Sequence, residues 1–229
     1  MADCATGERA VARRTAPEPA FGVVGARIAP DAAVPTLAFR LQIGSRAEDD
    51  IRSIVLAVQI RIATARRPYG AAERERLSEL FGDRAQSPAP QDRLWTHASV
   101  VVPPFVRETT VEIPIACTYD MEIATTKYFH ALDDGEVPLD FLFSGSVFYA
   151  DPDGRLQTCR ISWDRQARFS LPVATWKVMI ERYYPECAWL RLDRATLDRL
   201  HAWKTRRALP TWQATMDALL AAADKGPQP

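Results

Sequence analysis

The cysteines and histidines are the residues of this sequence best suited to nucleophilic catalysis or metal binding. The four cysteines lie far apart and form no Cys-x-x-Cys pair of the kind that structural zinc sites use, so the sequence predicts no metal site. They are Cys4, Cys117, Cys159 and Cys187. The last three stand among apolar residues, and an apolar environment raises the pKa of a thiol and leaves it unreactive. We therefore expect free, inert thiols in a reducing compartment, and no cofactor.

Other catalytic motifs are incomplete. The segment Phe-Ser-Gly-Ser at residues 143–146 resembles a serine nucleophile turn, but it lacks the G-x-S-x-G form and runs on into a strand instead of a helix. No glycine-rich phosphate loop occurs, and the three histidines are isolated from one another. We therefore expect no enzymatic activity. A catalytic site assembled in space stays an alternative, and its groups would be Cys117, Tyr119, Asp120 and His130.

Charge and hydropathy exclude two classes of partner. The 29 basic and 29 acidic residues cancel, whereas nucleic acids and anionic membrane surfaces favour a net basic protein. No run of about 18 apolar residues is available to span a membrane. The first ten residues lack the apolar centre of a signal peptide. We expect a cytoplasmic protein that neither binds nucleic acid nor inserts into a membrane.

The strongest structural signal is a β-hairpin from Val137 to Trp163. Two strand-like runs flank Asp-Pro-Asp-Gly at residues 151–154, where proline presets the turn angle and glycine tolerates positive φ. In the first run Phe141 and Phe143 point to one face and Leu142 to the other, so both faces are apolar. This pattern predicts a strand in the middle of a sheet that is covered on both sides.

Further strands and helices surround this hairpin. The runs 36–43 and 54–62 alternate between apolar and polar residues, and their succession predicts an antiparallel pair. Strands are also predicted at 21–28, 93–102 and 111–117, with Pro114 placing the last at an edge or a bulge. Helices are predicted at 71–81, 120–132 and 173–184, after Asp193 and after Thr211. This order indicates an α+β fold, an antiparallel sheet of sandwich-like or SecB-like form with helices concentrated at the C-terminus.

The composition also suggests domain boundaries. Residues 1–19 are rich in Ala, Arg, Glu and Pro without periodicity, which predicts a disordered N-terminal tail. Residues 20–223 are expected to form a single α+β domain, mainly β from 20 to 170 and helical from 171 to 223. Residues 224–229 are expected to be frayed. The exposed first strand leaves open the pairing of sheet edges between subunits, and with it a homo-oligomer.

Aromatic residues are the best candidates for a binding surface. The chain has six tryptophans, and tryptophan is enriched at interfaces as well as in cores. Several of them fall among the C-terminal helices, which either cover the sheet or carry an exposed docking patch. The candidate protein-binding residues are Trp95, His97, Tyr128, His130, Trp176, Trp189 and Trp203.

Several stretches together resemble an uncharacterised bacterial domain-of-unknown-function family. They include Leu-Trp-Thr-His (94–97), Val-Val-Pro-Pro-Phe (101–105), Lys-Tyr-Phe-His-Ala-Leu (127–132), Gly-Glu-Val-Pro-Leu-Asp-Phe-Leu-Phe-Ser-Gly (135–145) and Arg-Arg-Ala-Leu-Pro-Thr-Trp (206–212). Members of that family are encoded near genes for high-affinity [NiFe]-hydrogenases. The resemblance covers residues 20–220 and implies an accessory or assembly role around that enzyme, without supplying catalytic residues.

A weaker likeness is to the export chaperone SecB. The run from Leu37 to Ile60 is similar to the paired strands of that family, and Leu171 to Leu197 is similar to its helical ending. The chain departs from SecB in the helix near 121–132, in its length and in its balanced charge.

These observations lead to one functional hypothesis and its alternatives. We expect a non-catalytic accessory or assembly factor that binds a protein, with hydrogenase subunits as the expected partner. The alternatives are a general SecB-like chaperone for unfolded chains, and an enzyme or small-ligand carrier with a site between sheet and helices.

Overall fold

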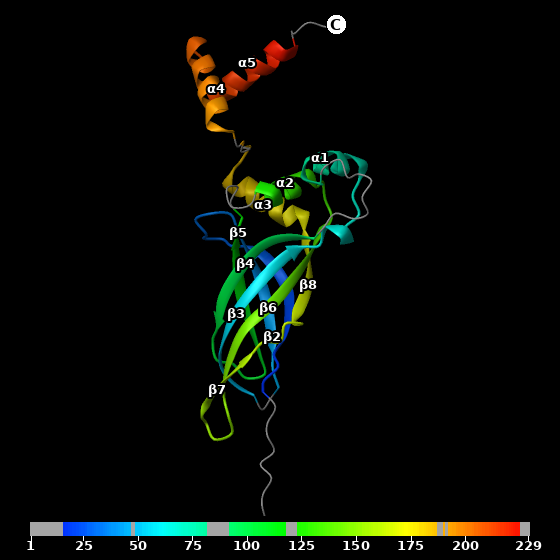
Figure 1. Cartoon of the computed structure of the whole chain (residues 1–229), viewed down its shortest axis with the longest axis vertical. Coiled ribbons are helices and arrows are strands. Elements are labelled where there is room, and N and C mark those ends of the chain that lie inside the picture. The colour runs from blue at the N-terminus through cyan, green and yellow to red at the C-terminus, as the bar shows by residue number, and fades with distance from the viewer. Residues whose placement is uncertain are drawn as a thin grey trace, which may run out of the picture. The chain divides into compact units, whose positions relative to one another are not determined.

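A computed structural model describes residues 16–46, 49–81, 92–117, 123–186, 190 and 192–224 of the chain (Figure 1). The chain divides into two compact units, Met1–Cys187 and Ala188–Pro229. The expectation of a single domain over residues 20–223 stays a prediction, as do the tails expected at 1–19 and 224–229.

The first unit contains two antiparallel sheets. The strands are β1 (Ala20–Ile28), β2 (Thr36–Gly44), β3 (Asp50–Ile62), β4 (Arg93–Val102), β5 (Glu108–Ala116), β6 (Glu136–Ala150), β7 (Leu156–Arg160) and β8 (Gln166–Pro172). One sheet has the order β1-β2-β5, and the five-stranded sheet has the order β4-β3-β6-β7, with β8 also paired to β6. With the helices given below, the prediction of an α+β fold is confirmed.

The predicted pairing of β2 with β3 is wrong. Strand β2 pairs with β1 and β5, while β3 pairs with β4 and β6, so the two strands belong to different sheets. Alternation identifies the buried face of a strand, but both edges of a strand carry the same backbone donors and acceptors. The sequence pattern therefore could not select the partner. The edge position expected from Pro114 is confirmed, because β5 ends its sheet.

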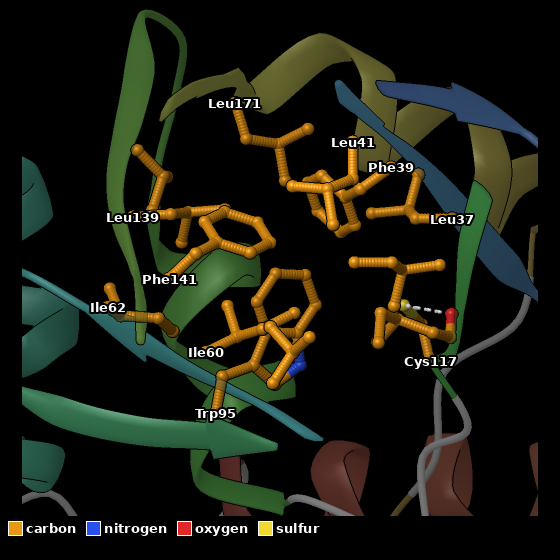
Figure 2. Packing of buried hydrophobic residues seen from close by; sticks show 14 of the residues in the cluster. Leu37, Phe39, Leu41, Ile60, Ile62, Trp95, Cys117, Leu139, Phe141 and Leu171 are labelled. Carbon is orange, nitrogen blue, oxygen red and sulfur yellow. Dashed lines mark hydrogen bonds between the residues drawn. The ribbon is translucent and has the colours of Figure 1, made fainter. Parts of the chain in front are cut away.

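The hydrophobic core lies between the inner faces of the two sheets. Phe39 of β2 meets Phe141 of β6 at a ring-centroid distance of 5.2 Å and Trp95 of β4 at 6.0 Å, both edge-to-face. Figure 2 shows these rings pointing toward one another among aliphatic side chains of both sheets. All three are buried. Edge-to-face pairs add to the burial energy of the rings, so this contact ties the sheets together.

The hairpin of β6 and β7 forms as predicted, and β6 is central because it pairs with β3, β7 and β8. The Asp151 carboxylate accepts hydrogen bonds from the backbone N–H of Asp153 (3.0 Å) and Arg155 (2.9 Å), which closes the turn. Gly154 has φ of 76°, the left-handed conformation that glycine tolerates. Strand β8 (Gln166–Pro172) was not predicted from the sequence.

Short helices lie together at one end of the strands in Figure 1. They are η1 (Thr64–Arg66), α1 (Ala71–Phe81), α2 (Ile123–Ala131) and α3 (Val173–Tyr183). Helix α3 buries Trp176, Met179 and Ile180, which recur at helical spacing as the sequence predicts. The predicted cap Asp120 lies outside the described residues.

The second unit is a pair of helices, α4 (Arg194–Arg206) and α5 (Trp212–Asp224). Both predicted caps are confirmed. The Asp193 carboxylate accepts from the backbone N–H of Thr196 at 2.8 Å, and the Thr211 hydroxyl accepts from the N–H of Ala214 at 3.1 Å. We call α4, α5 and their connection the helical hairpin.

Candidate functional site

An aromatic cluster lies where the short helices meet the sandwich. The Phe129 ring of α2 stacks on Trp176 of α3 at 5.0 Å and approaches Trp95 of β4 at 5.5 Å. Trp95 and Trp176 are 3% and 2% exposed, and Phe129 is fully buried. These rings therefore belong to the core, and no partner reaches them without displacing a helix.

His130 lies at the rim of this cluster. The centre of the His130 ring lies 5.1 Å from that of Trp176, edge-on to it, and His130 is exposed to solvent. Partial burial and the nearby charge of Lys177 lower the pKa of His130 below the ordinary value of 6.5. Both effects favour the neutral imidazole.

A buried ion pair forms the main polar cluster of the first unit. Arg67 and Glu73 form a bidentate ion pair, with Nη1–Oε2 and Nη2–Oε1 distances of 3.0 Å. Their side chains are only 6% and 8% exposed. The remaining Arg67 donors reach the carbonyls of Pro68, Asp134 and Glu136. All five guanidinium N–H donors therefore have an acceptor. We call this pair and its backbone partners the Arg67–Glu73 clamp.

Glu73 completes the clamp through its own acceptors. Its Oε2 accepts the backbone N–H of Gly70 and its Oε1 accepts that of Asp133, both at 3.0 Å. The hydrogen bonds from Arg67, followed by these backbone donors, lower the pKa of Glu73 to about 2 even though burial acts in the opposite direction. The clamp thus joins the start of α1 to the segment before β6.

Two tyrosines extend the clamp. The hydroxyls of Tyr69 and Tyr128 are 2.9 Å apart, and the Tyr69 hydroxyl donates to the carbonyl of Thr64 at 2.9 Å. The Arg67 guanidinium lies 5.2 Å from the centre of the Tyr69 ring. Burial raises the pKa of both phenols, so neither ionises near neutral pH. Because its groups are engaged with one another, the clamp serves to hold structure.

The thiol considered for nucleophilic catalysis is Cys117. It is buried, its Sγ donates to the carbonyl of Ile115 at 3.5 Å, and burial raises its pKa to about 12. A thiol with this pKa stays protonated and is a poor nucleophile. Tyr119 and Asp120, the other proposed partners of His130, lie outside the described residues.

The helical hairpin has a different character, because its apolar residues are incompletely buried. No residue of α4 is buried, and Thr215 is the buried residue on α5. Leu197 and Trp212 are 44% and 40% exposed, and Leu220 is 65% exposed. The hairpin thus carries apolar surface that its own two helices leave open.

The connection between the two helices gathers cations and indole rings. The Lys204 ammonium donates to the carbonyls of Leu209 (2.8 Å) and Pro210 (3.3 Å) and lies 5.9 Å from the Trp212 ring centre. Arg207 lies 4.4 Å over the Trp203 ring, and the His201 ring is 6.1 Å from that of Trp212. We call the following set the basic-aromatic corner: His201, Trp203, Lys204, Arg207 and Trp212.

Comparison with known proteins assigns a family. The model of a family of unknown function, DUF6084, matches residues 16–228. The chain belongs to this family. The match spans the residues of both the sandwich and the helical hairpin. No curated protein matches the sequence.

Among solved structures, the DUF6084 chain is similar to a late embryogenesis abundant (LEA) protein, with 14% identity and a TM-score of 0.31 over 72% of this chain and 76% of that one. It is also similar to a β-glucosidase from Kluyveromyces marxianus, with 10% identity and a TM-score of 0.23 over 67% of this chain and 15% of that one. TM-scores this low carry no conclusion about fold or function.

The candidate binding residues fall into separate groups. Trp95, Tyr128 and Trp176 are buried in the first unit, because the helices α2 and α3 and the paired sheets cover them. His97 is exposed on β4, opposite Gln59 of β3, and takes no part in the aromatic cluster. His130 lies at the rim of that cluster, and Trp203 is half-buried in the helical hairpin. Trp189 lies outside the described residues.

Sequence reasoning missed most of the basic-aromatic corner. Trp212, Lys204 and Arg207 were not among the candidates, although residues 199–216 contain no Asp or Glu. That acid-free segment is the signal that would have found them. In the described part of the chain, no group of three or more His, Cys, Asp or Glu side chains is placed to hold a metal ion. None of the described helices combines the length and apolar character that crossing a bilayer requires.

Proposed function

We propose that the protein is a non-catalytic accessory factor that binds another protein through its helical hairpin. The observation that carries the proposal is the exposure of apolar side chains on the hairpin. Leu197, Trp212 and Leu220 remain 40–65% exposed on a pair of helices in which α4 has no buried residue.

The energetics of the hairpin favour a partner. Each helix has 13 residues and is about 20 Å long, and units below about 40 residues rarely bury enough surface to be stable alone. Covering Leu197 and Leu220 would contribute about 1–2 kcal/mol each at their present exposure. A protein surface that covers these two leucines therefore gains binding energy and stabilises both helices.

The partner that we propose is a [NiFe]-hydrogenase subunit or a maturation intermediate of that enzyme, acting in the cytoplasm. This choice rests on the sequence resemblance described above, and the hairpin supplies the means of binding. The protonated, buried thiol of Cys117 argues against the competing enzyme built around that residue.

Two leucines of matched exposure allow a direct test. Leu220 on α5 is 65% exposed and Leu156 on β7 of the sandwich is 66% exposed, so neither Leu→Gln change should alter folding. Purified full-length protein would be tested by biolayer interferometry against purified hydrogenase subunits from the same cell. We expect L156Q to bind as the wild type does and L220Q to bind about 10-fold more weakly.

Equal binding of both variants, or no binding to any subunit, would overturn the proposal. Binding of a reduced, permanently unfolded protein with an affinity equal to that for the subunits would favour the general chaperone instead.

A further inference from the structure

We infer that the segment recognised by the helical hairpin is acidic and amphipathic, and that the basic-aromatic corner binds its carboxylates. This inference rests on the proposed function, because it names the chemistry of the partner at the same surface. It goes beyond that function by predicting which side chains the partner presents.

Charge is strongly one-sided at this corner. Residues 199–216 include four Arg or Lys residues and no Asp or Glu, although the whole chain has 29 of each sign. Within the described residues, no carboxylate lies within ion-pair distance of Arg199, Arg206 or Arg207, while arginines of the sandwich such as Arg27 and Arg66 are paired. The corner therefore holds positive charge that the described part of the chain leaves uncompensated.

The cations are also held in place. Lys204 bridges the carbonyls of Leu209 and Pro210, and Arg207 rests on the Trp203 ring at 4.4 Å. Side chains that are already positioned lose less conformational entropy when they bind a carboxylate. The corner is thus better prepared for an acidic ligand than a flexible basic tail would be.

An exposed leucine lies on the same side of α4 as Lys204. Leu197, His201 and Lys204 recur at i, i+4 and i+7 along α4, and therefore share one side of that helix. Trp212 of α5 lies beside His201 and Lys204. A partner segment that places a leucine or phenylalanine against Leu197 would bring acidic residues one or two turns along to Lys204 and Arg207. This pattern is that of an amphipathic acidic helix.

Single-stranded nucleic acid fits the corner less well. Base recognition without sequence preference uses open aromatic faces along a continuous basic groove. Here Arg207 occupies a face of Trp203, Lys204 lies over Trp212, and the chain as a whole is neutral. Charge complementarity therefore favours carboxylates carried by a protein.

Matched arginine variants test the inference on the full-length protein. R207Q removes one charge from the corner, and R155Q removes one from a side chain of the sandwich that is 77% exposed. The probes are a labelled 16-residue amphipathic helix of Leu and Glu, the same peptide with Lys for Glu, a 20-nucleotide single-stranded DNA, and phosphatidylcholine/phosphatidylglycerol vesicles. Binding is followed by fluorescence anisotropy for the peptides and DNA, and by co-sedimentation for vesicles.

We expect the Leu/Glu peptide to bind in a salt-sensitive manner, with a loss of about 3-fold in R207Q and no change in R155Q. Circular dichroism of each variant checks that the helices remain formed. No salt-sensitive binding of this peptide at millimolar concentration, or tighter binding of DNA or vesicles, would overturn the inference.

The two proposals fail in distinguishable ways. If hydrogenase subunits bind and L220Q weakens that binding while R207Q has no effect at any salt concentration, the proposed function holds and the acidic-partner inference is wrong. If the acidic peptide binds at the corner and no hydrogenase subunit does, the inference holds and the identity of the partner is wrong.

Discussion

Replacing Glu73 by glutamine would leave the Arg67 guanidinium buried without a carboxylate. The two side chains are only 6% and 8% exposed, and the change also weakens the acceptors for the backbone N–H groups of Gly70 and Asp133. Breaking a buried pair by removing one charge costs about 3–5 kcal/mol. We therefore expect E73Q to lower the free energy of unfolding at pH 7 by about 3 kcal/mol, which is a large part of the stability of a typical domain.

The pKa of Glu73 leads to a similar magnitude independently. It falls from an ordinary 4.5 to about 2 in the folded protein, and this difference corresponds to about 3 kcal/mol. Because the folded-state pKa is the lower one, the unfolded chain binds the proton first as the pH falls. The stabilisation is therefore complete above about pH 4.5 and is lost between there and about pH 2. In E73Q this part of the pH dependence should be absent.

The assay is urea unfolding of the full-length protein, followed by tryptophan fluorescence at pH 7, 4 and 3. The control is E112Q, since Glu112 pairs with Arg27 at 2.7 Å on the surface, where the two side chains are 40% and 49% exposed. An exposed pair contributes about 0–1 kcal/mol, so E112Q should unfold close to the wild type. A loss below 1 kcal/mol for E73Q at pH 7, or an unchanged pH dependence, would refute the reasoning.

Three further substitutions test the local geometry. Gly145 has φ of 137° and a Cβ placed there would lie 2.0 Å from the carbonyl oxygen of Val55, so we expect G145A to destabilise the sandwich by more than about 2 kcal/mol in urea unfolding. G154A, at a turn glycine with open space around it, should cost about 1 kcal/mol, and an equal cost for both would contradict this account. D193A removes the N-cap of α4 and should destabilise that helix by about 1 kcal/mol, measured as faster amide exchange in its first turns; unchanged exchange there would show that the cap is dispensable.

The elements of this fold follow from local patterns. The alternation of Leu37, Phe39 and Leu41 predicts β2 and its buried face, and all three are fully buried. The Asp-Pro-Asp-Gly turn predicts the hairpin of β6 and β7, and Asp193 predicts the start of α4. These signals are readable because each depends on residues within a few positions of one another.

The partners of those elements could not be read in the same way. Nothing in the alternation of β2 and β3 separates a paired strand from a strand in the facing sheet, since both arrangements bury the same side chains. Glu73 of the clamp accepts from Asp133, 60 residues away, and Arg67 donates to Glu136, 69 residues away, and no local pattern reports such contacts. Strand β8 forms beside β6 and not beside its neighbour in the chain.

The candidate site likewise combines features that the sequence predicts with features that only the tertiary structure decides. The sequence alone identified the aromatic residues of the C-terminal helices, the balanced charge of the chain and the absence of complete catalytic motifs. The tertiary structure decided which aromatics are exposed: Trp95 and Trp176 are buried because α2, α3 and two sheets converge on them, while Trp212 keeps 40% of its surface open. The physical reason is that residue type sets how much a side chain gains from burial, whereas the packing of distant elements sets whether anything covers it.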